Sequence, residues 1–435
     1  MQKIKIKDFG PIANLNLNIK DFMLFVGPQA SGKSTIAKTI FFFKSLNDDL
    51  VKFFMDYLDK KDQSKISNIA FRKIISRKFL DYFGPSSPLK GMELTYFYNN
   101  DLWVNITLEK THNYVTPSFS PLLSSHINKL IKKTIEFCRS IQKDAVLLTS
   151  KDLMQLERTR QKYIVQITDQ INLLFGETHE LLYIPAGRSL LATLSDQLQS
   201  IDPKNLDFLM RTFVQKINLL RSMFSRSIND LITARMALTN SEIDFSRVRI
   251  AEKIINKILK GKYKYETDGE KIYIGDTNKY VKLNFASSGQ QESLWILLLI
   301  FIIILEKQNA FVVIEEPEAH LYPEAQKEIS ALIALLSNMK QSQVIITTHS
   351  PYVLASVNNL MLANKVGKDH LDKISEKIHK HLWIKRDKVY AALVQSGEIT
   401  DIIDPELDII RQEVIDSVSQ QINEEFDFLY QYATN

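Results

Sequence analysis

The sequence predicts an α/β fold in which a mixed sheet is flanked by helices and carries an inserted helical lobe. A strand that is apolar throughout, FMLFV (22–26), leads into a glycine-containing loop and then a helical stretch. Two more apolar segments, FVVIEE and QVIITTH, end in polar or charged residues, as is typical of parallel strands buried on both faces. The residues between 46 and 283 are too many for a loop, so they predict an insertion.

The N-terminal region and the insertion have their own periodicities. QKIKIKDF and IANLNLNI alternate polar and apolar residues with period two, and FGPI between them is a turn. Residues 91–110 alternate around an Asn-Asn-Asp turn and predict a hairpin that extends this sheet. Residues 121–178 and 201–260 have helical apolar spacing, about 3.6 residues per turn.

The composition excludes several classes of protein. With 435 residues, 45% hydrophobic and 24% charged, the chain is too apolar to be disordered or collagen-like. Its single cysteine, Cys138, cannot form an internal disulfide. Residues 396–435 contain ten acids and one base, which leaves 54 basic and 40 acidic residues upstream. A basic body with an acidic tail is compatible with nucleic-acid binding and equally with solvated faces.

The sequence has the features of a cytoplasmic protein without a membrane partner. The N-terminus, MQKIKIKDFG, lacks the apolar stretch of a signal peptide. The longest apolar run is the twelve residues from Leu294 to Leu305, whereas a membrane-spanning helix needs about 20. We therefore expect this run to form a deeply buried helix.

GPQASGKST, which follows the strand FMLFV, is a Walker A loop. Gly27 and Gly32 allow backbone conformations and close approaches that a Cβ would block. Backbone N–H groups at the following helix N-terminus then surround a phosphate. Lys33 reaches the β- and γ-phosphates, and the Ser34 hydroxyl ligates Mg²⁺. We expect ATP and Mg²⁺ as cofactors and assign ATP binding to the complete loop: Gly27, Pro28, Gln29, Ala30, Ser31, Gly32, Lys33, Ser34 and Thr35.

Two further strand ends are expected to complete the site. FVVIEEPEAHLYP ends its strand in two glutamates, of which Glu315 holds Mg²⁺ and Glu316 orients or deprotonates the attacking water. QVIITTHSPYVL leads to His349, which is placed to contact the γ-phosphate and hold that water in line. We assign catalysis to Glu316, His349 and Lys33, and metal binding to Ser34 and Glu315.

A second anion-binding device precedes the most apolar helix. In NFASSGQQESLWILLLIFIIIL, a serine caps the helix and a glycine lets the backbone approach a ligand closely. Capped helix N-termini of this kind bind anions. The Walker A loop already holds one phosphate chain, so this segment has no obvious ligand in its own molecule. Its residues are Ser287, Ser288, Gly289 and Gln290.

These motifs, in this order, resemble those of an ABC-type P-loop ATPase. The resemblance implies that two ATP molecules are sandwiched in a head-to-tail dimer, where the signature Ser287–Gln290 of one subunit meets the ATP of the other. EEPEAHLYP and TTHSPYVL resemble the OLD-type, RecF-like branch, and YIPAGRS (183–189) with ASSGQQE resembles its PtuA-like anti-phage ATPases. Transporter subunits usually have aspartate at the position of Glu315, which makes a transporter the least favoured interpretation.

The resemblance covers 1–45 and about 180–360. It implies an ATPase that controls a separate effector, a nuclease, in bacterial anti-phage defence, as a homodimer or a higher even-numbered oligomer. OLD-type proteins often append a TOPRIM nuclease; residues 350–435 are too few for one, so we expect the nuclease on another chain. The alternatives are a stand-alone RecF-like DNA repair or recombination ATPase, and a scaffold that binds ATP and seldom hydrolyses it.

We expect four segments along the chain. They are an N-terminal ATPase part with Walker A (1–120), a helical insert (121–260, with 181–189 returning to the ATPase core), a C-terminal ATPase part (261–360) and a C-terminal region (361–435).

Three features outside the motifs each allow two interpretations. Arg188 ends an apolar segment and either contacts phosphate or forms a structural ion pair. Two basic clusters either contact a DNA backbone or are solvated: Lys129, Lys132 and Lys133, and Arg72, Lys73, Arg77 and Lys78. The acidic tail has apolar residues at helical spacing, which predict an amphipathic helix packed on its own domain or on a partner: Ile410, Val414, Val418, Ile422 and Phe426.

Overall fold

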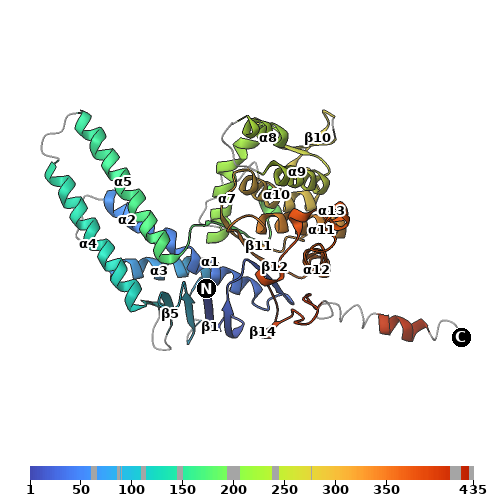
Figure 1. Ribbon diagram of the computed structural model, residues 1–435, viewed down its shortest axis with the longest axis horizontal. Coiled ribbons are helices and arrows are strands. Elements are labelled where there is room, and N and C mark those ends of the chain that lie inside the picture. The colour runs from blue at the N-terminus through green and yellow to red at the C-terminus, as the bar shows by residue number, and fades with distance from the viewer. Residues whose placement is uncertain are drawn as a thin grey trace. The chain divides into compact units, whose positions relative to one another are not determined.

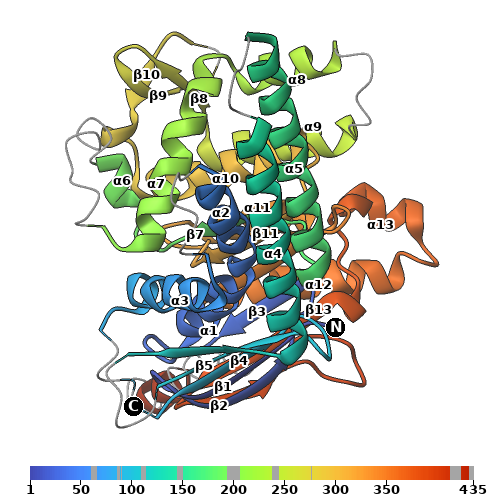
Figure 2. The same ribbon diagram turned by 90° about the vertical axis from the view of Figure 1, so that its left-hand side faces the viewer.

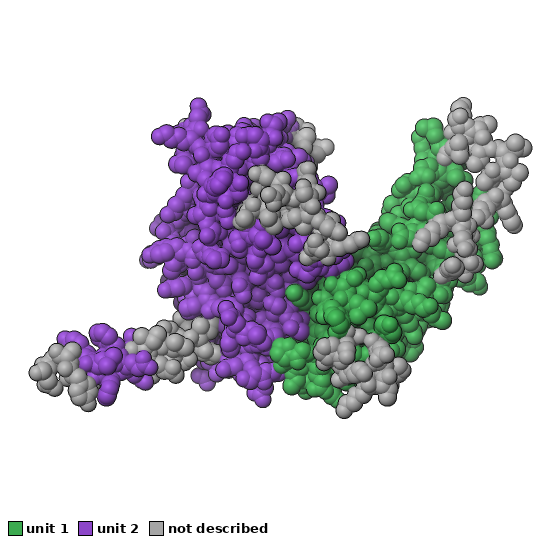
Figure 3. Space-filling view, turned by 180° about the vertical axis from the view of Figure 1, so that it is seen from behind, with its two compact units in different colours: residues 1–19, 38–178 green, residues 20–37, 179–435 purple. Residues whose placement is uncertain are grey.

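The structure, a computed structural model, describes residues 1–59, 66–85, 89, 91–108, 114–144, 150–193, 206–237, 244–275, 277–411 and 423–430. The chain forms two compact units: unit 1 comprises residues 1–19 and 38–178, and unit 2 comprises 20–37 and 179–435 (Figure 3). The predicted α/β class is confirmed, because both units combine sheets with helices. The division into four segments along the chain stays a prediction. The compact units are not consecutive in sequence, because residues 20–37 of unit 2 lie between the two parts of unit 1.

Unit 1 contains a five-stranded antiparallel sheet of order β2-β1-β4-β5-β6. Both predicted hairpins are confirmed, and β4 extends the N-terminal sheet by pairing with β1. Burial alternates along the strands, as the period-two sequence pattern requires. The strands are β1 (Lys3–Phe9), β2 (Ile12–Asn18), β4 (Glu93–Phe97), β5 (Trp103–Thr107) and β6 (Thr116–Phe119).

The predicted helical character of the first half of the insert is also confirmed. Helices α4 and α5 lie side by side as a long pair (Figures 1 and 2), and the rings of Phe137 and Tyr163 stack 3.8 Å apart between them. A buried ion pair joins Lys44, the last residue of α1, to Glu177, just after α5. The helices are α1 (Lys33–Lys44), which begins in unit 2, α2 (Leu46–Asp59), α3 (Asn68–Phe83), α4 (Pro121–Asp144) and α5 (Ser150–Phe175).

Unit 2 contains a six-stranded mixed sheet of order β14-β13-β3-β12-β11-β7. Five of these strands run parallel, and β14 pairs antiparallel with β13. The carboxyl ends of β3, β12, β11 and β7 therefore lie at one edge of the sheet. The strands are β3 (Phe22–Val26), β7 (Glu180–Ile184), β11 (Ala310–Glu315), β12 (Gln343–Thr348), β13 (Val389–Gln395) and β14 (Glu398–Asp401).

A smaller antiparallel sheet and most of the helices complete unit 2. The sheet consists of β8 (Lys262–Glu266), β9 (Gly269–Tyr273) and β10 (Tyr280–Lys282). The α-helices are α6 (Ser189–Thr193), α7 (Phe208–Leu220), α8 (Ile228–Met236), α9 (Phe245–Leu259), α10 (Ser288–Leu305), α11 (Pro323–Ser337), α12 (Pro351–Val366) and α13 (Leu371–Lys377). The 3₁₀ turns in the described part of this unit are η3 (Arg221–Ser225), η4 (Leu283–Phe285), η5 (Lys380–Leu382) and η6 (Arg386–Lys388).

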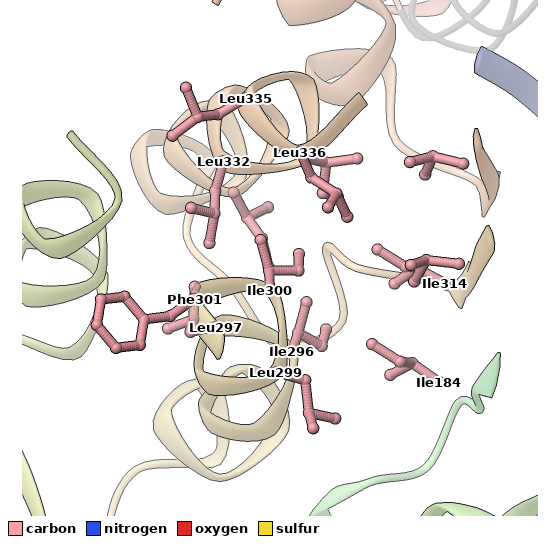
Figure 4. Packing of buried hydrophobic residues seen from close by; sticks show 14 of the residues in the cluster. Ile184, Ile296, Leu297, Leu299, Ile300, Phe301, Ile314, Leu332, Leu335 and Leu336 are labelled. Atoms are coloured by element: carbon pink, nitrogen blue, oxygen red, sulfur yellow. The ribbon is translucent and has the colours of Figure 1, made fainter. Parts of the chain in front are cut away.

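Helix α10 forms the centre of the apolar core, as predicted. Every residue from Glu292 to Leu305 is buried. Figure 4 shows Ile184 and Ile314 of the sheet facing the helix, with Leu332 and Leu336 of α11 on another side. Burial of each such side chain contributes about 1.5–3 kcal/mol. In the described part of the chain, α10 alone is long and apolar enough to cross a membrane by length and composition, and 78% of it is buried inside the protein.

Two sequence-based expectations need correction. Ile410 does not lie on an amphipathic helix: it is fully buried in a β-bridge with Ile403, and its backbone N–H and carbonyl both bond to the Asn358 side chain. Val414, Val418 and Ile422 lie outside the described residues, and Phe426 is exposed on a short helix, 423–430.

The second basic cluster is also not a continuous cationic face. Lys78 is buried, forms an ion pair with Asp49 and donates to Ser45 Oγ at 2.7 Å. Arg72 lies over the ring of Phe119, 5.0 Å from its centroid. Only Lys73 and Arg77 of this cluster are exposed.

Candidate active site

The predicted motifs follow neighbouring parallel strands of unit 2. The Walker A loop follows β3, the two glutamates end and follow β11, and His349 follows β12, the strand between them. Because parallel strands end at the same edge, the sheet brings these segments together. The segment YIPAGRS ends β7 on the far side of β11.

The Walker A loop is held by close backbone packing. Gly27 has φ +146°, and a Cβ there would lie 2.1 Å from the carbonyl oxygen of Val394 on β13. Glycine is therefore required, because β13 packs directly against the loop. Pro28, Gln29 and Ala30 are exposed.

Lys33, the first residue of α1, folds back over this loop. Its ammonium donates to the carbonyl oxygens of Gly27 at 2.8 Å and Pro28 at 2.7 Å. Burial lowers the pKa of Lys33, while Glu316 and Glu318 act to raise it. The hydroxyl of Ser31 is buried without a hydrogen-bond partner among the described residues. Gly32 is also buried, and Ser34 and Thr35 are half-buried at the start of α1.

Glu315 fits a cation. Its buried carboxylate accepts the backbone N–H of Ala186 through Oε2 at 3.1 Å, while Oε1 has no hydrogen-bond partner in the described part of the chain. A buried carboxylate oxygen left unpaired is costly, so a cation or its hydration shell suits this position. The described residues contain no cluster of three or more metal-binding side chains. A Mg²⁺ ion here would take most of its ligands from phosphate and water, as this ion usually does.

Glu316 and His349 meet directly. Nε2 of the histidine lies 3.2 Å from Oε1 of the glutamate, and both side chains are partly exposed. The backbone of Glu316 is left-handed, with φ +45°, and its N–H donates to the carbonyl of Thr347 at 2.9 Å. Non-glycine residues adopt this conformation at a cost, often at functional sites.

Glu318 belongs to the same group of residues and was missed by sequence reasoning. Its Oε1 accepts the hydroxyl of Thr348 at 2.6 Å and the backbone N–H of His349 at 2.8 Å. It therefore fixes the turn that carries the histidine. The signal was present, because Glu318 lies two residues after Glu316 in EEPEAH.

Arg188 forms the structural ion pair rather than an exposed phosphate contact. It is 2% exposed, its Nε lies 3.2 Å from Oε2 of Glu292, and its guanidinium donates to several backbone carbonyls. Burial lowers the pKa of Arg188, and Glu292 is the carboxylate that most opposes this change. Sequence reasoning did not identify Glu292, because it lies inside an apolar helix whose pattern indicates only burial.

The signature forms the N-terminus of α10. Ser287 caps the helix and exchanges hydrogen bonds with Gln290, whose Nε2 donates to the carbonyl of Leu259 at 2.7 Å. Ser287 and Ser288 are exposed. A Cβ on Gly289 would lie 2.8 Å from the carbonyl oxygen of His320, so close packing within the chain also requires this glycine.

Comparison with known proteins decides the family. Residues 1–354 match the family described as AAA ATPase domain. The chain belongs to this AAA ATPase domain family. The protein is an ATPase that hydrolyses ATP to ADP and phosphate.

Individual relatives of this ATPase are more distant. The OLD nuclease of Thermus scotoductus is 40% identical over 63 residues, which is 14% of this chain and 12% of that protein. The ATPase thus matches a small part of that relative's length.

Solved structures of SMC head domains are similar to this chain, with low TM-scores. One bound to the C-winged helix domain of ScpA has TM-score 0.44 and 13% identity, covering 92% of this chain and 96% of that chain. The SMC head domain from Thermotoga maritima has TM-score 0.36 and 13% identity, with coverages of 92% and 97%.

Proposed function

We propose that this ATPase holds ATP and Mg²⁺ at the loop Gly27–Thr35 and hydrolyses ATP with Glu316 as the base. The observation that carries the proposal is the contact between Glu316 and His349, at the sheet edge that also carries Lys33 and Glu315. A base beside its orienting partner, next to a phosphate-binding loop, is the arrangement that phosphoryl transfer to water requires.

Each side chain has a defined task in this proposal. The oxygen of water bonds to the γ-phosphorus while the bond from that phosphorus to the β–γ bridging oxygen breaks. Glu316 accepts the proton that the water loses, and His349 keeps Glu316 and the water in line with the γ-phosphate. Lys33 and the loop N–H groups stabilise the charge that moves to the departing ADP. Ser34 and Glu315 would hold Mg²⁺, which neutralises phosphate charge when bound.

Head-to-tail dimerisation through ATP is part of the proposal. It is supported by the exposure of Ser287 and Ser288 at the N-terminus of α10, where the helix dipole favours an anion. Exposed aromatic side chains lie near three of the motifs in sequence: Phe285 precedes the signature and is 78% exposed, Tyr322 follows the two glutamates and is 79% exposed, and Tyr352 follows His349 and is 51% exposed. Aromatic residues are enriched at protein interfaces. A second copy that covers these side chains would also bring its signature to the ATP.

We further propose that the dimer controls a nuclease on a separate chain in bacterial anti-phage defence. The support is the short similarity to an OLD nuclease, and the resemblance of YIPAGRS and ASSGQQE to PtuA-like ATPases. The nuclease would respond to the nucleotide state of the dimer, since opening and closing around ATP changes the surface that an effector meets.

Purification from the native host at native level tests this proposal. Phosphate release, molar mass with and without ATP, and co-purifying chains identified by mass spectrometry are measured on one preparation. We expect ATP turnover, a doubling of mass with ATP in the Glu316→Gln variant, and a stoichiometric nuclease. If the Glu316→Gln variant stays a monomer in saturating ATP, the proposed dimer is wrong. If no nuclease co-purifies, the proposed control of an effector is wrong.

A stand-alone RecF-like DNA repair ATPase is the second candidate. It is favoured by a cavity of about 360 Å³ in unit 1, lined in part by His126, Lys129 and Lys133, with leucines of α5 beside them. Lysines can hold a DNA backbone without reading its sequence. This candidate predicts that DNA stimulates hydrolysis without any effector, that salt weakens the stimulation, and that Lys129→Glu with Lys133→Glu abolishes it.

A further inference from the structure

One guanidinium connects three segments of unit 2. Nη1 of Arg188 donates to the carbonyl of Pro185 at 2.6 Å, just after β7, and to that of Glu315 at 2.7 Å, at the end of β11. Nη2 donates to the carbonyl of Glu316 at 2.9 Å, and Nε to that of Glu292 at 3.0 Å, on α10. A lysine could not make these bonds together, because its ammonium lacks the planar fork.

The carboxylate of Glu292 completes the connection from the side of α10. It is 2% exposed and lies one turn into the helix whose N-terminus is the signature. Its oxygens accept the backbone N–H groups of Arg188 at 3.2 Å and Ser189 at 2.9 Å. Both charges are therefore buried and satisfied by each other and by backbone groups, which fixes their geometry.

The bonds to Glu315 and Glu316 hold the backbone on both sides of the proposed base. The carbonyl of Glu315 belongs to the peptide group before the Cα of Glu316, and the carbonyl of Glu316 belongs to the peptide group after it. Arg188 thus restrains both neighbouring peptide groups of a residue with φ +45°. A left-handed glutamate persists only where its surroundings hold it. From this backbone the side chain of Glu316 reaches Nε2 of His349, 3.2 Å from its Oε1.

We propose that Arg188 and Glu292 form a positioning pair that couples the signature helix to Glu316. Neither residue is catalytic in this proposal, since both are buried away from solvent. The pair fixes the backbone of Glu316, and a shift of α10 is transmitted to the base through the guanidinium. The coupling between subunits rests on the ATP sandwich of the proposed function. When the signature of one subunit binds the ATP held by its partner, the resulting shift of α10 adjusts Glu316 in the same subunit as that signature, and this base acts on the subunit's own ATP.

Two conservative variants test the pair. Arg188→Lys keeps the positive charge and loses the fork, and Glu292→Gln keeps the shape and loses the negative charge. We expect each to lower kcat about 10²-fold with KM unchanged, and to bind a fluorescent ATP analogue within about threefold of wild type. Glu177→Gln is the matched control, because it breaks the equally buried ion pair with Lys44 in unit 1. It should lower the melting temperature and leave kcat within about twofold.

A second measurement separates positioning from general destabilisation. In the Glu316→Gln background, Arg188→Lys should cause no further loss of the residual rate, because a pair that acts only through Glu316 is non-additive with it. The proposal would be overturned if Arg188→Lys lowered the rate of the Glu316→Gln variant by as large a factor as it lowers the rate of the wild type. It would also be overturned if Arg188→Lys and Glu292→Gln, each alone, kept kcat within twofold of wild type. If Glu316→Gln itself turns over normally, the proposed function fails at the base, which is distinguishable from failure of the pair. If the Arg188→Lys variant does not fold, the same comparison is made with Glu292→Gln in the wild type and in the Glu316→Gln variant.

Discussion

Nε2 of His349 lies 3.2 Å from Oε1 of Glu316, across two neighbouring parallel strands. The contact joins residues that are 33 positions apart in sequence, and each is also held through its backbone. The N–H of Glu316 bonds to the carbonyl of Thr347, and the N–H of His349 bonds to Glu318. Hydrogen bonds within the protein therefore hold the pair, and such fixed geometry is what an efficient base needs.

Glu316→Gln is expected to lower ATP hydrolysis by about 10²- to 10⁴-fold, because the amide cannot accept the proton of water. ATP binding should be preserved, since the variant keeps the shape and the loop Gly27–Thr35 is untouched. Phosphate release and equilibrium binding of ATP measure the two effects. Lys33→Ala is the control: it should lose binding as well as turnover. Ordinary turnover in Glu316→Gln would remove this residue from the role of base.

Glu318 offers a matched pair of substitutions. Glu318→Ala removes the oxygen that holds the Thr348 hydroxyl and the His349 N–H, so the histidine turn loosens and kcat should fall about tenfold or more. Glu318→Gln retains one acceptor oxygen and should keep most of the activity. Steady-state kinetics of both variants provide the check. Equal losses in the two variants would mean that the charge of Glu318, rather than its hydrogen bonds, is what matters.

The sequence predicted the elements whose pattern is local. The apolar strand before GPQASGKST, the two N-terminal hairpins and the buried helix at Leu294–Leu305 follow from periodicity and turn residues alone. The proximity of Glu315, Glu316 and His349 followed from one rule, that parallel strands end at the same edge.

The remaining features depend on contacts that no local pattern contains. Strand β13 joins the central sheet from a region without recognisable motifs, and its Val394 carbonyl explains why Gly27 must be glycine. A buried structural arginine and a phosphate-binding arginine look the same in sequence, so the sequence leaves both roles open for Arg188. Its partner Glu292 distinguishes them, and this partnership depends on the packing of α10 against the end of β7.

Gly27→Ala is expected to destabilise unit 2 by about 2–5 kcal/mol, as the sum of backbone strain and overpacking. The added Cβ would lie 2.1 Å from a backbone carbonyl oxygen, which cannot rotate away. Gly275→Ala is the comparison, since its φ is +60° but the added Cβ has nothing within 4 Å. It should cost only about 1–2 kcal/mol. Urea unfolding of both variants measures the difference, and equal costs would show that β13 does not pack against the loop.

The stability of unit 2 is expected to fall with acidification, through His379 and His381 in and beside η5. Burial lowers the pKa of both imidazoles, with further lowering by Lys380 for His379 and by Arg247 for His381, while Asp244 opposes the change for both. The unfolded chain titrates near the ordinary value of about 6.5, so between that value and the lower folded pKa it binds more protons than the folded chain. Stability is then full above about pH 6.5 and decreases as the pH falls through this window.

The melting temperature measured from pH 7.5 to 5 checks this expectation. Replacing both histidines, His379→Gln with His381→Gln, should flatten the decrease, because glutamine does not titrate. His126→Gln replaces an exposed histidine on α4 of unit 1; it controls for the removal of a histidine and should leave the decrease unchanged. If the double variant loses stability on acidification as steeply as the wild type, the acid sensitivity comes from other groups and the two imidazoles are not buried in the neutral form.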